Sequence, residues 1–254
     1  MKIFFSEFPA DYGKYHFPYQ VFLVKEGDNE AGKIYEMGFL PVRSIKNLYY
    51  LARSVRVNLE KFELSSENRR ILRKTEEFEG ELVKLEEFDY TPQIQKICKD
   101  WFEARFGKGK ISAAAIRKIF TAGIFSHIFI WRQKEETAGY AVVFINEKVV
   151  HYAHVFSNPR FTKSNLGARM MLEAIIWAKE NGKKYAYLGT CYEKNALYKT
   201  EFMGVEFFNG LTWSSNLEEL KYLINRKTGD YLFRDKEFRE KFYGKEIKEL
   251  FNLK

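Results

Sequence analysis

The chain has 254 residues, of which 46% are hydrophobic and 30% charged, and its formal net charge is +8 at pH 7. This composition is typical of a soluble globular protein of one or two domains, and the basic balance suits an anionic partner such as nucleic acid. Two distant cysteines, Cys98 and Cys191, exclude a disulfide framework and a zinc site and predict a cytoplasmic protein, while the lack of an 18-residue apolar run excludes a membrane span.

Residues 1–88 are predicted to form an N-terminal module. Its first 50 residues are rich in aromatic and turn-forming residues, with a strand expected at 21–24. The alternation of apolar and polar residues at 55–60 predicts a half-buried strand. Ser65 or Ser66 is then expected to cap a short helix, because a serine oxygen accepts from the free N–H groups of a helix start.

A reversal of charge marks the end of this module. Residues 53–74 carry seven basic and three acidic side chains, whereas residues 75–88 carry six acidic and one basic. We place a domain boundary at this reversal, which divides the chain into 1–88 and 89–254.

The second part of the chain shows a regular series of elements. Thr91-Pro92 begins a helix whose apolar stripe, including Trp101, Phe102 and Phe106, is predicted to be core. A second helix, three strands, a long helix and a buried strand follow at 113–123, 126–132, 138–146, 148–156, 166–182 and 185–190. This order is that of GNAT acyltransferases, so the predicted fold class is α+β, a small N-terminal module plus a GNAT-like mixed-sheet domain. An amphipathic helical tail is predicted from Arg226 onward.

Four segments resemble the arginyl-tRNA–protein transferases and their bacterial leucyl-transferring relatives. The resemblance extends with gaps from about residue 5 to residue 215. In the first module it rests on YEMGFLPV (35–42) and on SVRVNLEKFELSSENRRILRK (54–74). In the second it rests on the segment from NPRF to YLGT (158–190) and on ALYKTEFMGVE (196–206). The resemblance implies an enzyme of the N-end rule type, which passes an amino acid from tRNA to the N-terminus of a protein.

A basic cluster in the first module is predicted to hold the acceptor end of tRNA. A helix N-terminus offers free backbone N–H groups, and arginine pairs bidentately with phosphate. The arginines concerned are Arg53, Arg56, Arg69, Arg70 and Arg73. The sequence alone also fits a solvated basic helix paired with the acidic residues 76–87, and it is the resemblance that favours tRNA.

The reaction implied by the resemblance requires little covalent catalysis by the protein. The aminoacyl ester is already activated, so the enzyme must position an amine and stabilise an oxyanion. In a GNAT fold the fourth and fifth strands separate, which would place HYAHVFSN and YAYLGT at the reaction centre. The resemblance makes Glu206 the candidate proton acceptor, and Tyr198 or Lys199 candidate contacts to the terminal adenosine of tRNA. A hydrogen-bonded tyrosine and a surface ion pair are the alternative for these three residues.

The implied partners are an aminoacyl-tRNA and a protein or peptide N-terminus. The aminoacyl-tRNA is a co-substrate, and no further cofactor is expected. Tyr49 and Ala52 stand where the family has cysteines, so no metal site is expected either.

The remaining reactive side chains are assigned structural roles. His151 and His154 are three apart on a strand, so we expect them to face opposite sides of the sheet, where they cannot share a metal ion. Cys191 follows the YLGT strand without evident histidine and aspartate company, which argues against a nucleophile.

Two other functions stay open. One is acetyl-CoA-dependent N-acetylation, but SNLGAR stands where such enzymes carry their pyrophosphate loop. There Ser164 replaces an arginine or glutamine, one glycine (Gly167) is left, and Arg169 is expected to obstruct the pyrophosphate. The other is an RNA- or peptide-binding relative without catalysis.

Overall fold

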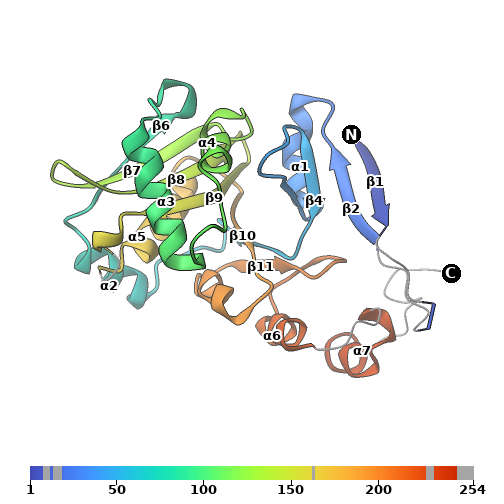
Figure 1. Ribbon diagram of the computed structural model, residues 1–254. Coiled ribbons are helices and arrows are strands. Elements are labelled where there is room, and N and C mark those ends of the chain that lie inside the picture. Colours follow the sequence, from blue (N-terminus) through green and yellow to red (C-terminus); the bar gives the residue numbers. More distant parts are fainter. Residues whose placement is uncertain (8–11, 14–18, 162–163, 227–231, 245–254) are drawn as a thin grey trace.

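The computed structural model describes residues 1–7, 12–13, 19–161, 164–226 and 232–244, which form two β-sheets (Figure 1). The smaller sheet is antiparallel throughout, in the order β1-β2-β4-β3. Its strands are β1 (Lys2–Glu7), β2 (Tyr19–Val24), β3 (Phe39–Pro41) and β4 (Leu48–Leu51). The 3₁₀ turn η1 (Asp28–Glu30) leads into α1 (Ala31–Glu36), and the buried face of α1 packs with this sheet against the larger one.

The larger sheet has the order β12-β11-β5-β10-β9-β8-β7-β6. Only β9 and β10 pair in parallel; the other neighbours are antiparallel. Its strands are β5 (Ser54–Asn58), β6 (Glu79–Lys84), β7 (His127–Gln133), β8 (Glu136–Ile145), β9 (Val149–Ser157), β10 (Tyr185–Thr190), β11 (Val205–Phe208) and β12 (Trp213–Ser214). The division between the two sheets therefore falls between β4 and β5, and not at the predicted boundary near residue 88.

Strand β5 differs from the half-buried strand predicted from its alternating sequence. It lies between β10 and β11, and its residues 54 to 57 are all buried. The apolar residues of β5 were expected inside, but Arg56 is buried as well, at 6% exposure. An arginine in such a place needs partners for its charge, and these are described with the site below.

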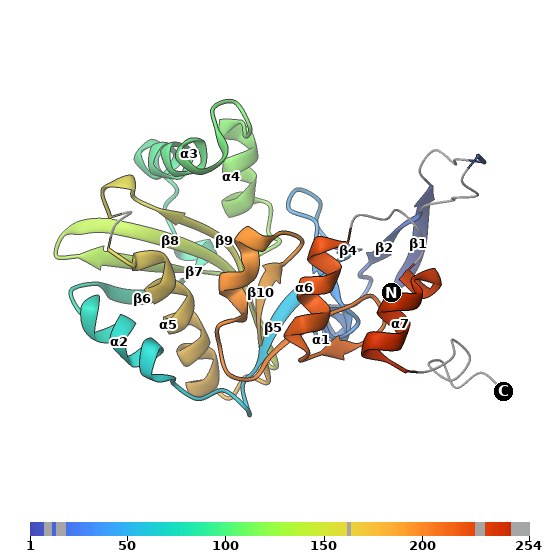
Figure 2. The same cartoon turned by 90° about the horizontal axis from the view of Figure 1, so that it is seen from below.

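Helices cover both faces of the larger sheet (Figure 2). Figure 2 shows α3 and α4 on one face and α2 and α5 on the other. Their bounds are α2 (Ser66–Lys74), α3 (Pro92–Phe106), α4 (Ala113–Thr121) and α5 (Leu166–Glu180). The side chain of Ser65 caps the first turn of α2, as predicted, and those of Thr91 and Ser112 cap α3 and α4.

The predicted order of elements is confirmed. From α3 through α4, β7, β8, β9 and α5 to β10, the chain runs helix–helix–strand–strand–strand–helix–strand. The fold is α+β with a GNAT-like mixed-sheet core. Two short 3₁₀ segments lie before and within this series, η2 (Leu85–Glu87) and η3 (Pro159–Phe161). After β10 come η4 (Lys194–Thr200), α6 (Leu217–Asn225), η5 (Leu232–Arg234) and α7 (Lys236–Phe242). Parts of the predicted C-terminal tail, 227–231 and 245–254, lie outside the described residues.

Candidate functional site

Strands β9 and β10 separate at the centre of the larger sheet. They pair only from Val149–Tyr185 to His151–Tyr187, although β9 continues to Ser157. Beyond His151, no strand among the described residues pairs with β9 on this side, so its backbone groups there face the gap. The strand separation predicted from the sequence is confirmed.

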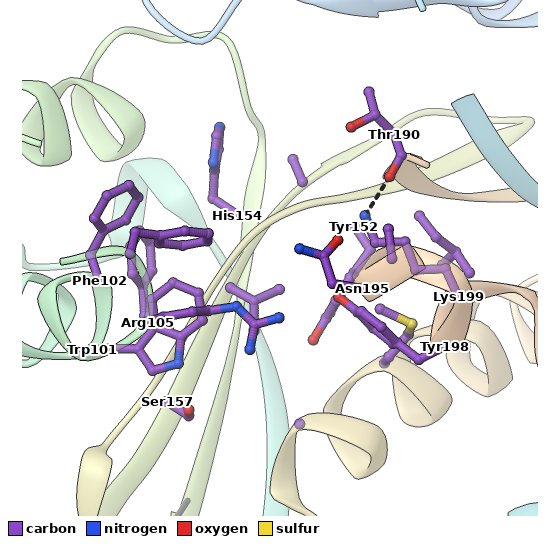
Figure 3. Close-up of a pocket in the computed structure, with 18 of the residues that line it drawn as sticks. Trp101, Phe102, Arg105, Tyr152, His154, Ser157, Thr190, Asn195, Tyr198 and Lys199 are labelled. Atoms are coloured by element: carbon purple, nitrogen blue, oxygen red, sulfur yellow. Dashed lines mark hydrogen bonds between the residues drawn. The ribbon is translucent and has the colours of Figure 1, made fainter. Parts of the chain in front are cut away.

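A cavity of about 950 Å³ occupies this gap (Figure 3). Its walls come from α3, from β9, from the first turn of α5, from the end of β10 and from η4. The apolar part of its lining is formed by Trp101, Phe102, Phe106, Ile119, Phe156, Met171 and Leu188. Trp101 and Phe102 are half-buried and pack against the core as predicted, although they also line the cavity. The prediction of a core position is wrong for Phe106, which is 51% exposed.

The charged groups of the cavity are mostly basic. Arg43, Arg105 and Lys199 line it, against a single carboxylate, Glu193, which is exposed. The Lys199 ammonium donates to the carbonyl oxygen of Thr190, 2.9 Å away. Burial lowers the pKa of Lys199, and the nearby charge of Arg105 lowers it further. The site therefore attracts anions.

Uncharged polar groups share the cavity. His154 lines it, and burial, followed by the charge of Arg43, lowers the pKa of its imidazole to about 3, so the ring is neutral at physiological pH. Tyr152 lines it too, at 3% exposure. Its buried hydroxyl has no hydrogen-bond partner among the described residues, which is costly unless a ligand supplies one.

A bulge corrects the expected orientation of the two histidines. The register of β8 and β9 shifts so that His154 pairs with Val142 while Tyr152 pairs with Val143. The extra residue on β9 shifts the alternation by one position, so the side chains of His151 and His154 lie on the same side of the sheet. Both rings lie against Phe125, with centroids 6.4 and 5.1 Å away. His151 has a structural role, since its Nδ1 lies 3.0 Å from the Tyr35 hydroxyl.

Two of the three predicted catalytic residues line the cavity. Tyr198 and Lys199 lie on η4, across the cavity from Trp101 and Phe102 (Figure 3). Glu206 lies on β11 and is not among the lining residues. Its Oε2 accepts from Nε and Nη2 of Arg56, at 2.9 and 2.8 Å. A catalytic role for Glu206 stays a prediction, and the structure gives this carboxylate an ion-pair partner.

Arg56 is enclosed on every side. Its guanidinium lies between the rings of Tyr185 and Trp213, 3.7 Å from each centroid, and Nη1 donates to the Tyr187 hydroxyl at 3.3 Å. With the Glu206 contact, this accounts for its 6% exposure. Arg56 is therefore not available to a tRNA phosphate in this structure, which corrects the prediction for this residue.

Arg53 lies close to the cavity. Its carbonyl oxygen accepts from the backbone N–H of Cys191 at 2.9 Å, and its guanidinium lies 5.5 Å from the ring centroid of Tyr192, a cavity-lining residue. Of the five predicted tRNA-binding arginines, Arg53 is the one that the structure brings to this rim.

The other three arginines are on the surface of α2. Arg69 donates to the carbonyl oxygen of Leu64 at 2.6 Å, and Arg70 forms an ion pair with Glu67. Arg73 is exposed. A contact of these arginines with tRNA is a prediction that this placement allows.

Helix α2 runs antiparallel to α5. The Leu72 carbonyl, near the end of α2, accepts from Arg169 at 3.0 Å, and the Phe62 carbonyl ahead of α2 accepts from Lys179. The cavity lies at the start of α5, where Gly167 lines it. The start of α2 therefore lies away from the cavity.

Arg169 does not obstruct the first turn of α5. It is held by the carbonyl oxygens of Leu72 and Phe78, at 3.0 and 3.1 Å, and by Glu173 at 2.6 Å. Gly167 lines the cavity instead. The prediction that Arg169 obstructs a pyrophosphate at this helix is therefore wrong. The replacement of an arginine or glutamine by Ser164 still argues against a pyrophosphate there.

Nucleophilic and metal sites are not supported. Cys191 is fully buried, and burial raises the pKa of its thiol, which disfavours the reactive thiolate. Within the described part of the chain, no group of three or more histidine, cysteine, aspartate or glutamate side chains could hold a metal ion. Nor does that part contain a helix with the length and apolar character to cross a membrane.

A family model described as "Arginine-tRNA-protein transferase, C terminus" matches residues 75–209, more than half of the chain. The matched segment contains the cavity walls from α3 to η4. No curated protein sequence matches the chain.

Solved structures with a similar arrangement differ widely in sequence. The structure of L-PGS from Bacillus licheniformis is 12% identical, with 82% of this chain and 74% of that chain covered at a TM-score of 0.45. FemX is 12% identical, with 80% and 72% covered at 0.46. A C-terminal domain described as that of a lysylphosphatidylglycerol synthetase from Agrobacterium fabrum is 13% identical, with a TM-score of 0.41. The match covers 67% of this chain and about half, 54%, of that chain.

Proposed function

Because this chain belongs to the arginine-tRNA-protein transferase family, we propose that it transfers an aminoacyl group from a charged tRNA to the N-terminal amine of a protein or peptide. In this reaction the amine nitrogen attacks the ester carbonyl, a C–N bond forms and the ester C–O bond breaks. The tRNA hydroxyl leaves with one proton. The observation that carries the proposal is the basic cavity between β9 and β10, all of whose lining residues except Arg43 belong to the matched segment.

The unpaired edge of β9 supplies the electrostatic part of the mechanism. In the described part of the chain, the backbone N–H groups of β9 beyond His151 have no strand opposite them on that side, and the Tyr152 hydroxyl in the same cavity has no hydrogen-bond partner. Donors that are already oriented toward an ester carbonyl stabilise the oxyanion of the tetrahedral intermediate without reorganisation. Placing the amine and ester together contributes the rest.

The proton of the attacking amine needs an acceptor inside the cavity. Among the cavity-lining groups, His154 is a neutral imidazole, while Glu193 is exposed at the rim. We therefore assign proton acceptance to His154, and this role requires the bound anionic end of tRNA to raise the pKa of the imidazole from about 3. Glu206 would have to leave the ion pair with Arg56 to take this role.

The tRNA would bind through charge. Arg43, Arg105 and Lys199 line the cavity and Arg53 stands near its rim, so the anionic 3′ end of tRNA meets positive charge there. No cofactor beyond the charged tRNA enters this scheme. An N-end rule role, and a cytoplasmic location where charged tRNA is available, belong to the same proposal.

The deciding experiment is incubation of the purified protein with charged total tRNA and peptides that differ only in their N-terminal residue. Mass spectrometry should detect peptides whose mass has increased by one amino-acid residue. Deacylated tRNA and N-acetylated peptides are the controls, because they lack the activated ester and the attacking amine. A parallel reaction with acetyl-CoA tests acetylation. Acetylated peptide without aminoacylated peptide would refute the proposal.

A further inference from the structure

The smaller sheet carries a row of aromatic side chains on the face that points away from α1. Leu23 and Tyr49, which lie opposite each other on β2 and β4, are buried with α1 on the inner face. The next pair along the two strands is Phe22 and Tyr50, and Phe4 of β1 lies opposite Phe22 on its other side. Successive side chains of a strand point to opposite faces, and residues directly opposite each other share a face. Phe4, Phe22 and Tyr50 therefore form one row on the outer face, which we call the aromatic row.

The aromatic row is accessible at the end formed by β1. Phe4 is 42% exposed, and Phe22 and Tyr50 are half-buried. The rings of Phe4 and Phe22 are stacked, with their centroids 5.4 Å apart. Single exposed apolar side chains are normal on a protein surface, but a contiguous row on one face indicates an interaction surface.

The other end of the aromatic row reaches the rim of the cavity. Figure 1 shows β4, β2 and β1 in this order away from the larger sheet, so Tyr50 is the member of the row nearest to that sheet. Tyr192 lines the cavity, and its hydroxyl accepts from the backbone N–H of Arg53 at 3.1 Å, two residues beyond the end of β4. Burial, followed by the nearby Tyr192, raises the pKa of Tyr50. The cavity and the aromatic row are therefore parts of one continuous surface.

The charges beside the aromatic row favour a polypeptide over RNA as its partner. On the outer face, the row is flanked by Lys2 and Ser6 of β1 and by Gln20 and Val24 of β2. Of these four side chains only Lys2 is charged, and its ammonium is paired with Glu26 at 3.1 Å. A nucleic-acid backbone needs cations along its path, whereas apolar side chains of a polypeptide bind an aromatic surface without them.

The length of the aromatic row fits a short stretch of extended chain. Neighbouring strands lie about 4.8 Å apart, so the distance from Tyr50 across β2 to Phe4 is about 10 Å. An extended polypeptide advances about 3.3 Å per residue, and every second side chain points to the same side. The row therefore accommodates about three residues, of which about two direct their side chains toward it.

We propose that the aromatic row binds the acceptor polypeptide just after its N-terminus, with the N-terminal residue in the cavity and apolar side chains at about positions 3–6 packed on the row. The inference rests on the proposed function, which supplies a polypeptide as the acceptor. It adds a second determinant of acceptor choice to the N-terminal residue itself. The partner so defined is an extended N-terminal segment with apolar side chains.

The test compares three peptides that share one N-terminal residue and an otherwise glycine- and serine-based sequence. The first has leucine at positions 4 and 6, the second has the same two leucines at positions 10 and 12, and the third has none. Fluorescence anisotropy of peptides labelled at the C-terminus measures binding to the full chain without tRNA. We expect the first peptide to bind about tenfold more tightly than the other two, which should bind alike.

Two substitutions on β1 separate the two faces of the sheet. Phe4→Thr removes the exposed end of the aromatic row and should reduce the advantage of the first peptide from about tenfold to about threefold. Ile3→Thr is the matched control, since Ile3 is 47% exposed and lies opposite Leu23, on the inner face. Threonine is favourable in strands, so neither variant should disturb the backbone of β1. Ile3→Thr should keep the whole advantage of the first peptide.

Four outcomes would overturn the inference. Equal binding of the first two peptides would show that the position of the leucines does not matter. Equal effects of Phe4→Thr and Ile3→Thr would show that the leucines do not contact the aromatic row. Weaker tRNA binding by Phe4→Thr, with peptide binding unchanged, would assign the row to RNA. A dimer that Phe4→Thr dissociates in sedimentation, again with peptide binding unchanged, would assign it to a second copy of the chain.

The proposed function fails in a different way. Leucine-dependent binding in the expected order, without transfer from any charged tRNA to any of the peptides, would refute aminoacyl transfer and leave the peptide-binding surface in place. Transfer to all three peptides at equal rates, with equal binding, would refute the inference and leave the proposed function in place.

Discussion

The ion pair of Glu206 and Arg56 gives a quantitative prediction about a residue that the sequence assigned to catalysis. The Glu206 side chain is 14% exposed and the Arg56 side chain 7% exposed. Removing one partner of a buried pair typically costs ~3–5 kcal/mol, because the other charge stays buried without compensation. Glu206→Gln keeps the shape and one acceptor oxygen, so we expect a loss of roughly 3 kcal/mol of unfolding free energy, at the lower end of that range.

The measurement is urea unfolding at pH 7, with the slope against urea compared between variants to check that the native surface is unchanged. Glu81→Gln is the matched control, since Glu81 pairs with Arg132 on the surface, where the side chains are 50% and 41% exposed. An exposed pair contributes ~0–1 kcal/mol. In the double variant Arg56→Met with Glu206→Leu, the loss should be smaller than the sum of the two single losses, because neither charge is left unpaired.

The same variant separates the two roles of the carboxylate. If Glu206 is the general base, Glu206→Gln should lower turnover ~10²–10⁴-fold while its stability resembles that of the control. If the ion pair defines its role, stability falls and single-turnover transfer by the folded fraction is unchanged. A Glu206→Gln protein that is as stable as Glu81→Gln would refute the structural reasoning.

Three further predictions follow from the site and the surface. His154→Gln should lower the rate of transfer ~10²–10⁴-fold with little change in tRNA affinity, and a wild-type rate in single-turnover assays would remove His154 as proton acceptor. Burial lowers the folded-state pKa of both His151 and His154 to about 3, below the ordinary 6.5, so the unfolded chain binds more protons between these values. The free energy of unfolding should therefore be highest above pH 6.5 and should fall toward pH 3, by at most about 1.4 kcal/mol per pH unit for each histidine. Urea unfolding at pH 7 and 5 should show a smaller decrease in this free energy for His151→Gln than for the unchanged protein. Replacing Arg69 and Arg70 together by alanine should weaken tRNA binding and reduce its salt dependence by roughly one unit of slope per lost phosphate contact, whereas unchanged affinity would mean that their contacts within α2 are all they provide.

Local signals in the sequence predicted the helices and strands well, but they could not predict which strands pair across long distances in the chain. The cap at Ser65 and the Thr91-Pro92 pair predicted the starts of α2 and α3, because a cap depends on neighbours three residues away. Burial of β5 depends on β10 and β11, whose residues follow more than 120 positions later. The sequence around Arg56 looked like a solvent-facing arginine, since the Tyr185 and Trp213 rings that enclose it could not be inferred from spacing.

The histidines illustrate the same limit within a single strand. Strict alternation places residues 151 and 154 on opposite faces, and one bulged residue reverses that result. The sequence around Ala153 carries no glycine or proline that would mark a bulge. The correct orientation matters for function, because it brings His154 to the cavity while His151 is held by Tyr35.

The apolar stripe of α3 provides the last test, because core and cavity wall share one sequence pattern. A core phenylalanine costs ~3–5 kcal/mol when replaced by alanine. Phe106 is 51% exposed and lines the cavity, so Phe106→Ala should cost less than ~1 kcal/mol of unfolding free energy. Its effect should fall on the ligand instead, as weaker binding of charged tRNA. Phe120→Ala is the comparison, since Phe120 is a core residue of α4 and is 5% exposed. This variant should lose the larger free energy of unfolding, ~3–5 kcal/mol. Equal losses in the two variants would place Phe106 in the core after all.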